Sequence, residues 1–249
     1  MTSVPRVALV TGGTRGIGRA VTERLVSDGV TVVAAYATDH DSANELRDRL
    51  ADDTTQVSVR QADVGDEGQC RDLVASVLEA HGRLDYVVSN AGTVIEQRLA
   101  EITEVDWHTQ LAVNLSGSFF LAQAAIPAMI DQGFGRVVNV GSVTALMGSP
   151  VQIAYGAAKA GLSGLTRSLA RSVARKGITV NCVIPGSIET DMSASLRYTD
   201  ASLVTPLIPM GRWGTPEEVA HAVTFLLDER SSYITGSVLT VDGGMSMGG

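Results

Sequence analysis

Tyr155 and Lys159 stand four positions apart in the stretch "YGAAK". If this stretch is helical, the phenol and the ammonium lie on the same face of the helix. A fixed positive charge beside a phenol favours the phenolate and lowers the pKa of the tyrosine, which could then exchange a proton near neutral pH. The five residues alone fit an ordinary pair on a solvated helix better, so the pair needs support from the rest of the chain.

A glycine-rich loop, "TGGTRGIG" at residues 11–18, follows the first apolar run. Gly12, Gly16 and Gly18 would allow a tight turn and let the backbone approach a pyrophosphate at the N-terminus of the next helix. The spacing G-x-x-x-G-x-G differs from the usual dinucleotide pattern G-x-G-x-x-G, and a plain strand–helix turn is the alternative. Its place between the first strand and the first helix favours a dinucleotide site.

The composition excludes several classes of protein. The chain has 249 residues, 45% of them hydrophobic, which suits one large domain. A net charge of −8 without a basic run argues against a nucleic-acid surface. No stretch approaches the length of an apolar membrane span and "MTSVPRVALV" lacks the regions of a signal peptide, so a cytoplasmic protein is expected. Cys70 and Cys182 stand far apart and the four histidines are scattered, so no metal site is predicted.

Short apolar runs alternate with helix-length segments along the chain. Strands are expected at residues 6–13, 30–37, 55–64, 84–92, 135–142, 178–186 and 238–244. Helices are expected at residues 16–29, 42–53, 66–82, about 104–131, about 152–176 and 215–229. The alternation predicts an α/β protein, a single domain over residues 1–249, with a parallel sheet covered by helices on both faces. The long irregular segment at about 185–214 is predicted to be a lid.

Several motifs occur together: the glycine loop, "NAG" at residues 90–92, Asn114, Ser142, and Tyr155 with Lys159. In this combination the chain resembles the short-chain dehydrogenase/reductase family over essentially its whole length. "IPGSIETDM" and the region from "GRWGTPEEVAHAVTFLL" to "SSYITGSVLTVDGG" are similar to its 3-oxoacyl-(acyl carrier protein) reductase branch. The resemblance implies a doubly wound, seven-stranded Rossmann-type sheet, a nicotinamide cofactor and a homotetramer built through the two long helices.

The small residues of the 152–176 helix would allow another helix to approach closely. They are Gly156, Ala157, Ala158, Ala160, Gly161, Ser163 and Gly164. Such a run could face either the same chain or a second subunit, and the resemblance favours the subunit interface.

The resemblance also implies four catalytic residues. Tyr155 would be the general acid in carbonyl reduction, and Lys159, with the positive nicotinamide, would lower its pKa and hydrogen-bond the cofactor ribose. Ser142 would hydrogen-bond the substrate carbonyl. Asn114 would hold a water that relays protons to Lys159. Taken singly, Ser142 could be a turn residue and Asn114 a structural cap or kink.

Other positions match cofactor contacts of the family. Asp63 would bond the adenine ring, and Ile188 and Thr190 would contact the carboxamide. The full expected set is Gly12, Thr14, Arg15, Gly16, Ile17, Gly18, Tyr36, Thr38, Asp63, Val64, Asn90, Ala91, Gly92, Tyr155, Lys159, Pro185, Gly186, Ile188 and Thr190. An apolar substrate wall could include residues that are more often simply core, namely Met147, Val151, Met192, Leu196 and Tyr198.

The end of the second expected strand bears on the choice of cofactor. Relatives that prefer NAD usually have an acidic residue there, which accepts bonds from the adenosine ribose hydroxyls. Tyr36 occupies this position without a charge, while Arg15 and Thr38 could bind the 2′-phosphate of NADPH, so NADPH is expected. Asp39 and Asp41 are a contrary signal, interpreted as the solvated start of the next helix. Arg15 could also be an ordinary surface arginine.

The leading hypothesis is an NADPH-dependent oxidoreductase that reduces a β-keto group of an acyl thioester. The substrate would be a fatty-acid or polyketide intermediate on a carrier protein, or acetoacetyl-CoA. The alternatives are an oxidoreductase of a free alcohol, sugar or cyclic ketone, and a non-catalytic dinucleotide sensor, against which the intact set of four residues weighs. Carrier docking is in doubt, because "IDQGFG" has no positive charge where carrier-dependent relatives often have basic residues. Arg175 and Lys176 do follow the next helix.

Overall fold

The fold is described by a computed structural model that covers residues 5–50, 57–194 and 201–247. Seven strands form one sheet in the order β3-β2-β1-β4-β5-β6-β7, and every neighbouring pair is parallel. The strands are β1 Val7–Thr11, β2 Thr31–Tyr36, β3 Val57–Gln61, β4 Tyr86–Ser89, β5 Gly135–Val140, β6 Ile178–Pro185 and β7 Val238–Val241. This confirms the predicted α/β fold with a doubly wound, seven-stranded Rossmann-type sheet.

The central strands are apolar on both faces, as a sheet covered by two helical layers requires. Every residue of β1, β4, β5 and β6 is buried. Valine recurs in these runs, as in "VALVT" and "YVVS", because its branched side chain fits the pleated surface of a strand. The edge strand β7 is only partly buried.

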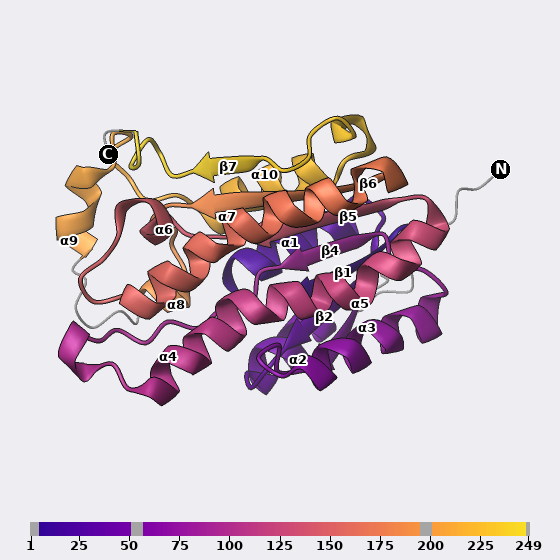
Figure 1. The fold of residues 1–249 in the computed structure, drawn as a ribbon, viewed down its shortest axis with the longest axis horizontal. Helices are drawn as coiled ribbons and strands as arrows, with labels where there is room; N and C mark the ends of the chain where they lie inside the picture. Colours follow the sequence, from indigo (N-terminus) through magenta and orange to yellow (C-terminus); the bar gives the residue numbers. More distant parts are fainter. Residues whose placement is uncertain (1–4, 51–56, 195–200, 248–249) are drawn as a thin grey trace.

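Helices cover the sheet in two layers (Figure 1). The longer helices are α1 Gly16–Ser27, α2 His40–Arg49, α3 Glu67–His81, α4 Glu104–Leu111, α5 Gly117–Gln132, α7 Ile153–Val173 and α10 Pro216–Leu227. α1 and α10 contact each other on one face of the sheet, while α3, α5 and α7 cover the other face. α2 begins at His40, two residues before the predicted start, because Asp39 caps it by accepting a 3.0 Å bond from the Ser42 amide.

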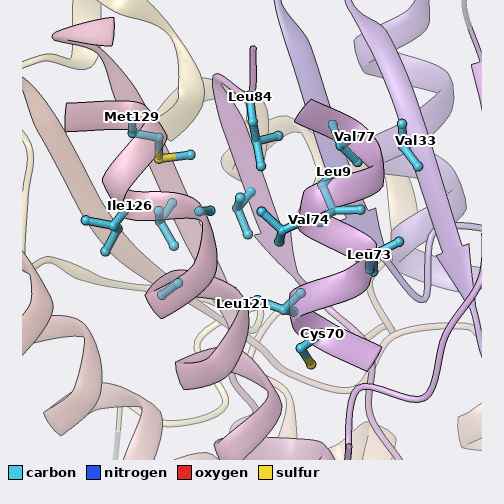
Figure 2. Close-up of a cluster of buried hydrophobic side chains, with 14 of the residues drawn as sticks. Leu9, Val33, Cys70, Leu73, Val74, Val77, Leu84, Leu121, Ile126 and Met129 are labelled. Carbon is cyan, nitrogen blue, oxygen red and sulfur yellow. The ribbon is translucent and has the colours of Figure 1, made fainter. Parts of the chain in front are cut away.

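The core between the sheet and the α3–α5 layer is closely packed (Figure 2). Apolar side chains of α3 and α5 interdigitate there over strands β1, β2 and β4. The labelled members are Leu9, Val33, Cys70, Leu73, Val74, Val77, Leu84, Leu121, Ile126 and Met129. A core of this size holds the strands, and therefore the loops at their ends, in fixed positions.

The long helix predicted at about 104–131 extends from Glu104 to Gln132, with one irregularity, the π-helical segment η2 (Ala112–Ser116) between α4 and α5. It has 29 residues, and its most apolar 18-residue stretch has a mean hydropathy of 1.4, so it reaches the length and composition of a membrane span. The prediction that no stretch approaches that length is therefore wrong. α5 also contacts α3, β4 and β5 in the core, which is a sufficient reason for its apolar composition. The cytoplasmic location stays a prediction.

Short elements gather where the strands end, at the left of Figure 1. They include α6 Thr144–Met147, α8 Asp191–Ala194, α9 Ala201–Val204 and the 3₁₀ turns η1 Leu99–Glu101 and η4 Thr205–Leu207. Elsewhere lie two more 3₁₀ turns, η3 Ala174–Lys176 and η5 Glu229–Ser231. The predicted lid at 185–214 thus contains short helices rather than a wholly irregular chain. The strand order reverses between β1 and β4, which places a binding crevice at the carboxyl ends of these strands.

Candidate active site

A cavity of about 580 Å³ opens along the carboxyl ends of β1, β4, β5 and β6. It brings together all but one of the expected cofactor residues, together with Ser142 and the substrate-wall candidates Met147 and Met192. The exception is Gly18, and neither Asn114 nor Val151 lines the cavity. Leu196 and Tyr198 lie outside the described residues.

The glycine loop folds as the dinucleotide interpretation requires. Gly16 has a φ of +51°, which glycine adopts without strain, and it begins α1. Gly18 lies one layer deeper: a Cβ there would come 2.0 Å from the carbonyl oxygen of Gly12, so only glycine lets the helix approach the loop. No side chain caps α1 at Arg15, and the first amides of the helix can therefore receive an anion.

Hydrogen bonds join the ends of β1 and β4 beneath this loop. The hydroxyl of Thr11 accepts bonds from the amides of Asn90 and Ala91, each at 3.1 Å. The Asn90 side chain donates in return to the carbonyls of Thr11 and Gly12, at 3.0 and 3.1 Å. Asn90 therefore fixes the glycine loop against the neighbouring strand, a role beyond the cofactor contact expected from "NAG".

One end of the cavity has the charges that would face the adenosine. Tyr36, Thr38 and Asp63 line it, as expected, and so does Asp39. A guanidinium nitrogen of Arg15 lies 3.8 Å from a carboxylate oxygen of Asp39. The hydrogen bonds from Ser42 hold the pKa of Asp39 below its ordinary value, so this carboxylate is ionised at neutral pH. Asp39, interpreted from the sequence as part of the solvated start of the next helix, is thus both the cap of α2 and a charge within the site.

Asn114 lies behind the cavity in the π-helical segment η2, a helix irregularity that is frequent at functional sites. Its amide nitrogen donates to the carbonyls of Thr93, at 2.8 Å, and Gln110, at 2.9 Å, and its oxygen accepts from the Thr93 amide, at 3.1 Å. The side chain therefore ties the long helix to the loop after β4. A Cβ at Gly92 would lie 2.9 Å from Oδ1 of Asn114 and 3.5 Å from Nζ of Lys159, so both groups converge on Gly92.

Three expected catalytic residues meet over the ends of β5 and α7. Ser142 follows β5, and Tyr155 and Lys159 share a face of α7, as their spacing predicted. Lys159 is 4% exposed, and its Nζ donates a 2.8 Å bond to the carbonyl of Val140 while lying 5.8 Å from the centroid of the Tyr155 ring. The side chains of Tyr155 and Ser142 are hydrogen-bonded to each other. Two hydroxyl groups therefore meet at one point of the cavity wall.

Burial has the largest effect on the pKa values of Tyr155 and Lys159. It raises the pKa of the Tyr155 phenol, against the opposing effect of the hydrogen bond with Ser142. Burial also lowers the pKa of Lys159 to about 8, a shift that the nearby Cys182 opposes. The Lys159 ammonium is directed at the Val140 carbonyl and does not offset the effect of burial on Tyr155. The expectation that Lys159 and the positive nicotinamide together lower the Tyr155 pKa stays a prediction.

Apolar side chains from the 185–214 segment and from the C-terminal segment also line the cavity. Met147 and Met192 line it together with Val204, Leu207, Trp213 and Met245. The indole of Trp213 donates a 3.1 Å bond to the hydroxyl of Thr205, which joins two parts of the 185–214 segment. The sequence carried no sign of Trp213 or Met245, since their approach depends on how distant segments fold back over the sheet.

The cavity as a whole suits an extended dinucleotide with a second molecule beside it. Glycine backbone and open helix amides fit a pyrophosphate, polar groups line the Tyr36 end, and Gly92 with Ile188 borders the middle. The hydroxyls of Ser142 and Tyr155 can both donate to one carbonyl oxygen beyond that point. This arrangement can bind a nicotinamide dinucleotide and deliver a proton to a carbonyl.

Comparisons with known proteins agree with this geometry. A short-chain dehydrogenase family profile, described as enoyl-(acyl carrier protein) reductase, matches residues 12–246. The 3-oxoacyl-(acyl carrier protein) reductase of Salmonella typhimurium is 40% identical over 97% of this chain and 98% of its own. The enzymes with that name from Escherichia coli K12 and Thermotoga maritima are 39% and 38% identical, over 97% and 96% of this chain and 98% and 97% of their own.

Proposed function

The chain belongs to the short-chain dehydrogenase/reductase family, and from this premise we propose that it reduces the 3-oxo group of an acyl thioester to a hydroxyl group. The observation that carries the proposal is the meeting of Ser142 and Tyr155 hydroxyls in the cavity, which supplies two donors for one carbonyl oxygen. The relatives that match over nearly the whole chain are named for the same reaction.

Each of the catalytic residues has a definite part in this chemistry. When bound, the reduced nicotinamide supplies the hydride that adds to the carbonyl carbon. Tyr155 donates the proton to the carbonyl oxygen, and Ser142 holds that oxygen by a hydrogen bond as negative charge develops on it. Lys159, with its pKa lowered to about 8, can return a proton toward the phenol near working pH. Asn114 would hold the water that relays protons to Lys159. Its hydrogen bonds to the carbonyls of Thr93 and Gln110 fix its position in the long helix.

The proposed reductant is NADPH rather than NADH. Tyr36 places no charge at the end of β2, and Arg15, at the start of α1, offers a cation for a 2′-phosphate. The carboxylate of Asp39 competes for this cation at 3.8 Å, so the preference rests on how much of the Arg15 charge remains for the cofactor.

A homotetramer is also proposed. The run of small residues in α7 divides into two sets: Gly161 faces inward, where a Cβ would come 2.8 Å from Leu115, whereas Ala157, Ala160 and Gly164 are exposed. α5 adds the exposed Phe119, 38% accessible. Exposed small and apolar residues on adjacent long helices suit helix packing between subunits.

Steady-state kinetics on four compounds would test the proposed reaction. The compounds are acetoacetyl-CoA, a 3-oxoacyl carrier protein, a small cyclic ketone and an enoyl-CoA, each with NADPH. The proposal expects the highest kcat/KM with one of the two 3-oxoacyl thioesters, and the ratio between them identifies the carrier. Preference for the cyclic ketone, or reduction of the enoyl thioester alone, as the description of the matching family would allow, would refute it.

A further inference from the structure

Gln152 is a cavity residue to which the proposed chemistry gives no task. It flanks the start of α7, three positions before Tyr155, so both residues lie on the same side of the first helical turn. A residue that flanks a helix start often caps the helix with its side chain, but the Gln152 side chain makes no capping bond. Its side-chain amide is instead held between the side chains of Glu96 and Thr144.

The hydrogen bonds of Gln152 determine which way its amide points. Nε2 donates to Oε1 of Glu96 at 3.0 Å, and Oε1 accepts from the hydroxyl of Thr144 at 3.1 Å. A carboxylate can only accept, so the nitrogen must face Glu96 and the oxygen must face Thr144. One N–H of the amide is thereby used, and the second has no acceptor within the described chain.

The same network connects Gln152 to the reacting end of the cavity. The backbone amide of Thr144 donates to Oγ of Ser142 at 3.2 Å, and the hydroxyl of Thr144 donates to Gln152. Glu96, which accepts the bond from the Gln152 side chain, is only 7% exposed. Its carboxylate is therefore buried next to the site, where it orients the Gln152 amide. A buried charged group usually has such a specific hydrogen-bonding task.

We propose that the free N–H of Gln152 binds the thioester carbonyl of the substrate, C1, while Ser142 and Tyr155 hold the 3-oxo group. This inference rests on the proposed function, since only a 3-oxoacyl compound has a second carbonyl one methylene away from the first. Gln152 is then the residue that distinguishes a 1,3-dicarbonyl from an isolated ketone, and Glu96 is a positioning residue that acts through it.

Two synthetic substrates test the assignment: an acetoacetyl thioester, and the thioether ketone in which a CH₂ replaces its C1 carbonyl. Gln152→Ala should lower kcat/KM for the thioester about tenfold, the effect of one lost hydrogen bond, and should leave the thioether within about twofold. Because each substrate is compared with itself in the wild-type enzyme, their different intrinsic reactivities cancel.

Gln97→Ala is a matched control, because Gln97 has the same amide in the adjoining segment but bonds to Asp106 and Glu101 outside the cavity. It should change neither substrate selectively. Glu96→Ala should reduce the preference for the thioester, and Glu96→Gln should largely restore it, since a glutamine oxygen still accepts from Gln152. Thermal unfolding shows whether each variant folds. If Gln152→Ala does not fold, Gln152→Leu takes its place in the test.

The outcomes separate the two proposals. Turnover of neither 3-oxoacyl substrate by the wild-type enzyme would overturn the proposed function, and the inference with it. Normal wild-type turnover, with Gln152→Ala affecting the thioester and the thioether equally, would overturn the role of Gln152 alone.

Discussion

The opposing charges of Arg15 and Asp39 lead to a prediction about cofactor affinity in which two substitutions act in opposite directions. In the free protein the exposed pair is worth at most about 1 kcal/mol, because solvent screens it at both partners. A charge-assisted bond from Arg15 to a 2′-phosphate is worth about 1.5–3 kcal/mol. Subtracting about 1 kcal/mol for the competing pair leaves about 0.5–2 kcal/mol, so Arg15→Ala should weaken NADPH binding about 2- to 30-fold and leave NADH nearly unchanged.

Asp39→Asn should do the reverse. Asparagine caps helices as well as aspartate does, so the bond from the Ser42 amide survives while the charge is removed. The loss of the competitor and of its repulsion should tighten NADPH binding by about 0.5–1 kcal/mol, or about two- to fivefold. Asp41→Asn, the same change in a residue outside the cavity, is the matched control.

Isothermal titration of both cofactors into each variant measures these effects directly. We expect Arg15→Ala to weaken NADPH binding and Asp39→Asn to tighten it, while both leave NADH binding almost unchanged. Equal weakening of both cofactors by Arg15→Ala would mean that Arg15 acts through the loop rather than through the phosphate. A gain of equal size in Asp39→Asn and Asp41→Asn would show that net charge, not the position of Asp39, is responsible.

Other expected outcomes concern catalysis, pH and assembly. Tyr155→Phe should lower kcat by about 10²-fold or more with little change in cofactor affinity, and near-normal turnover would remove Tyr155 from the role of general acid. Because burial lowers the Lys159 pKa from 10.5 to about 8, the unfolded chain binds more protons between these values, and folding gains stability as pH rises. Urea titrations should therefore show that the free energy of unfolding of the wild type, relative to that of Lys159→Met, rises by up to about 3 kcal/mol from pH 7 to 10.5. If the two proteins show the same dependence on pH, the lowered Lys159 pKa is contradicted. Phe119→Glu should yield species smaller than a tetramer by light scattering, and an unchanged mass would exclude Phe119 from the interface.

The sequence predicted the fold almost completely, because its signals are local or periodic. Apolar runs located all seven strands, and the helix expected at residues 215–229 is α10, which starts after a complete capping box at Thr215. The π-helical turn around Asn114 was not predicted, since no residue type in "AVNLS" marks such a turn.

The candidate site was predictable where residue type and spacing determine the chemistry. The glycine loop was found in this way, whereas Tyr155 and Lys159 gained their roles from the resemblance of the whole motif set to a known family, because their spacing alone fits an ordinary helix pair better. The direction of the Tyr155 pKa shift was not predictable, because it depends on burial that a spacing of four residues cannot reveal. Gln152 carried a weak signal, its position three residues before Tyr155, whereas Glu96 reaches it from 56 residues away and carried none.

Hydride transfer to C3 of a 3-oxoacyl thioester is the central claim, and isotopic labelling tests it most directly. The protein would be incubated with acetoacetyl-CoA and NADPH deuterated on one face or the other of nicotinamide C4, and the product analysed by mass spectrometry. The account predicts 3-hydroxybutyryl-CoA with one deuterium on C3 from only one of the two cofactors. Failure to label C3 from either cofactor, or incorporation only when an enoyl thioester replaces the 3-oxo compound, would contradict it.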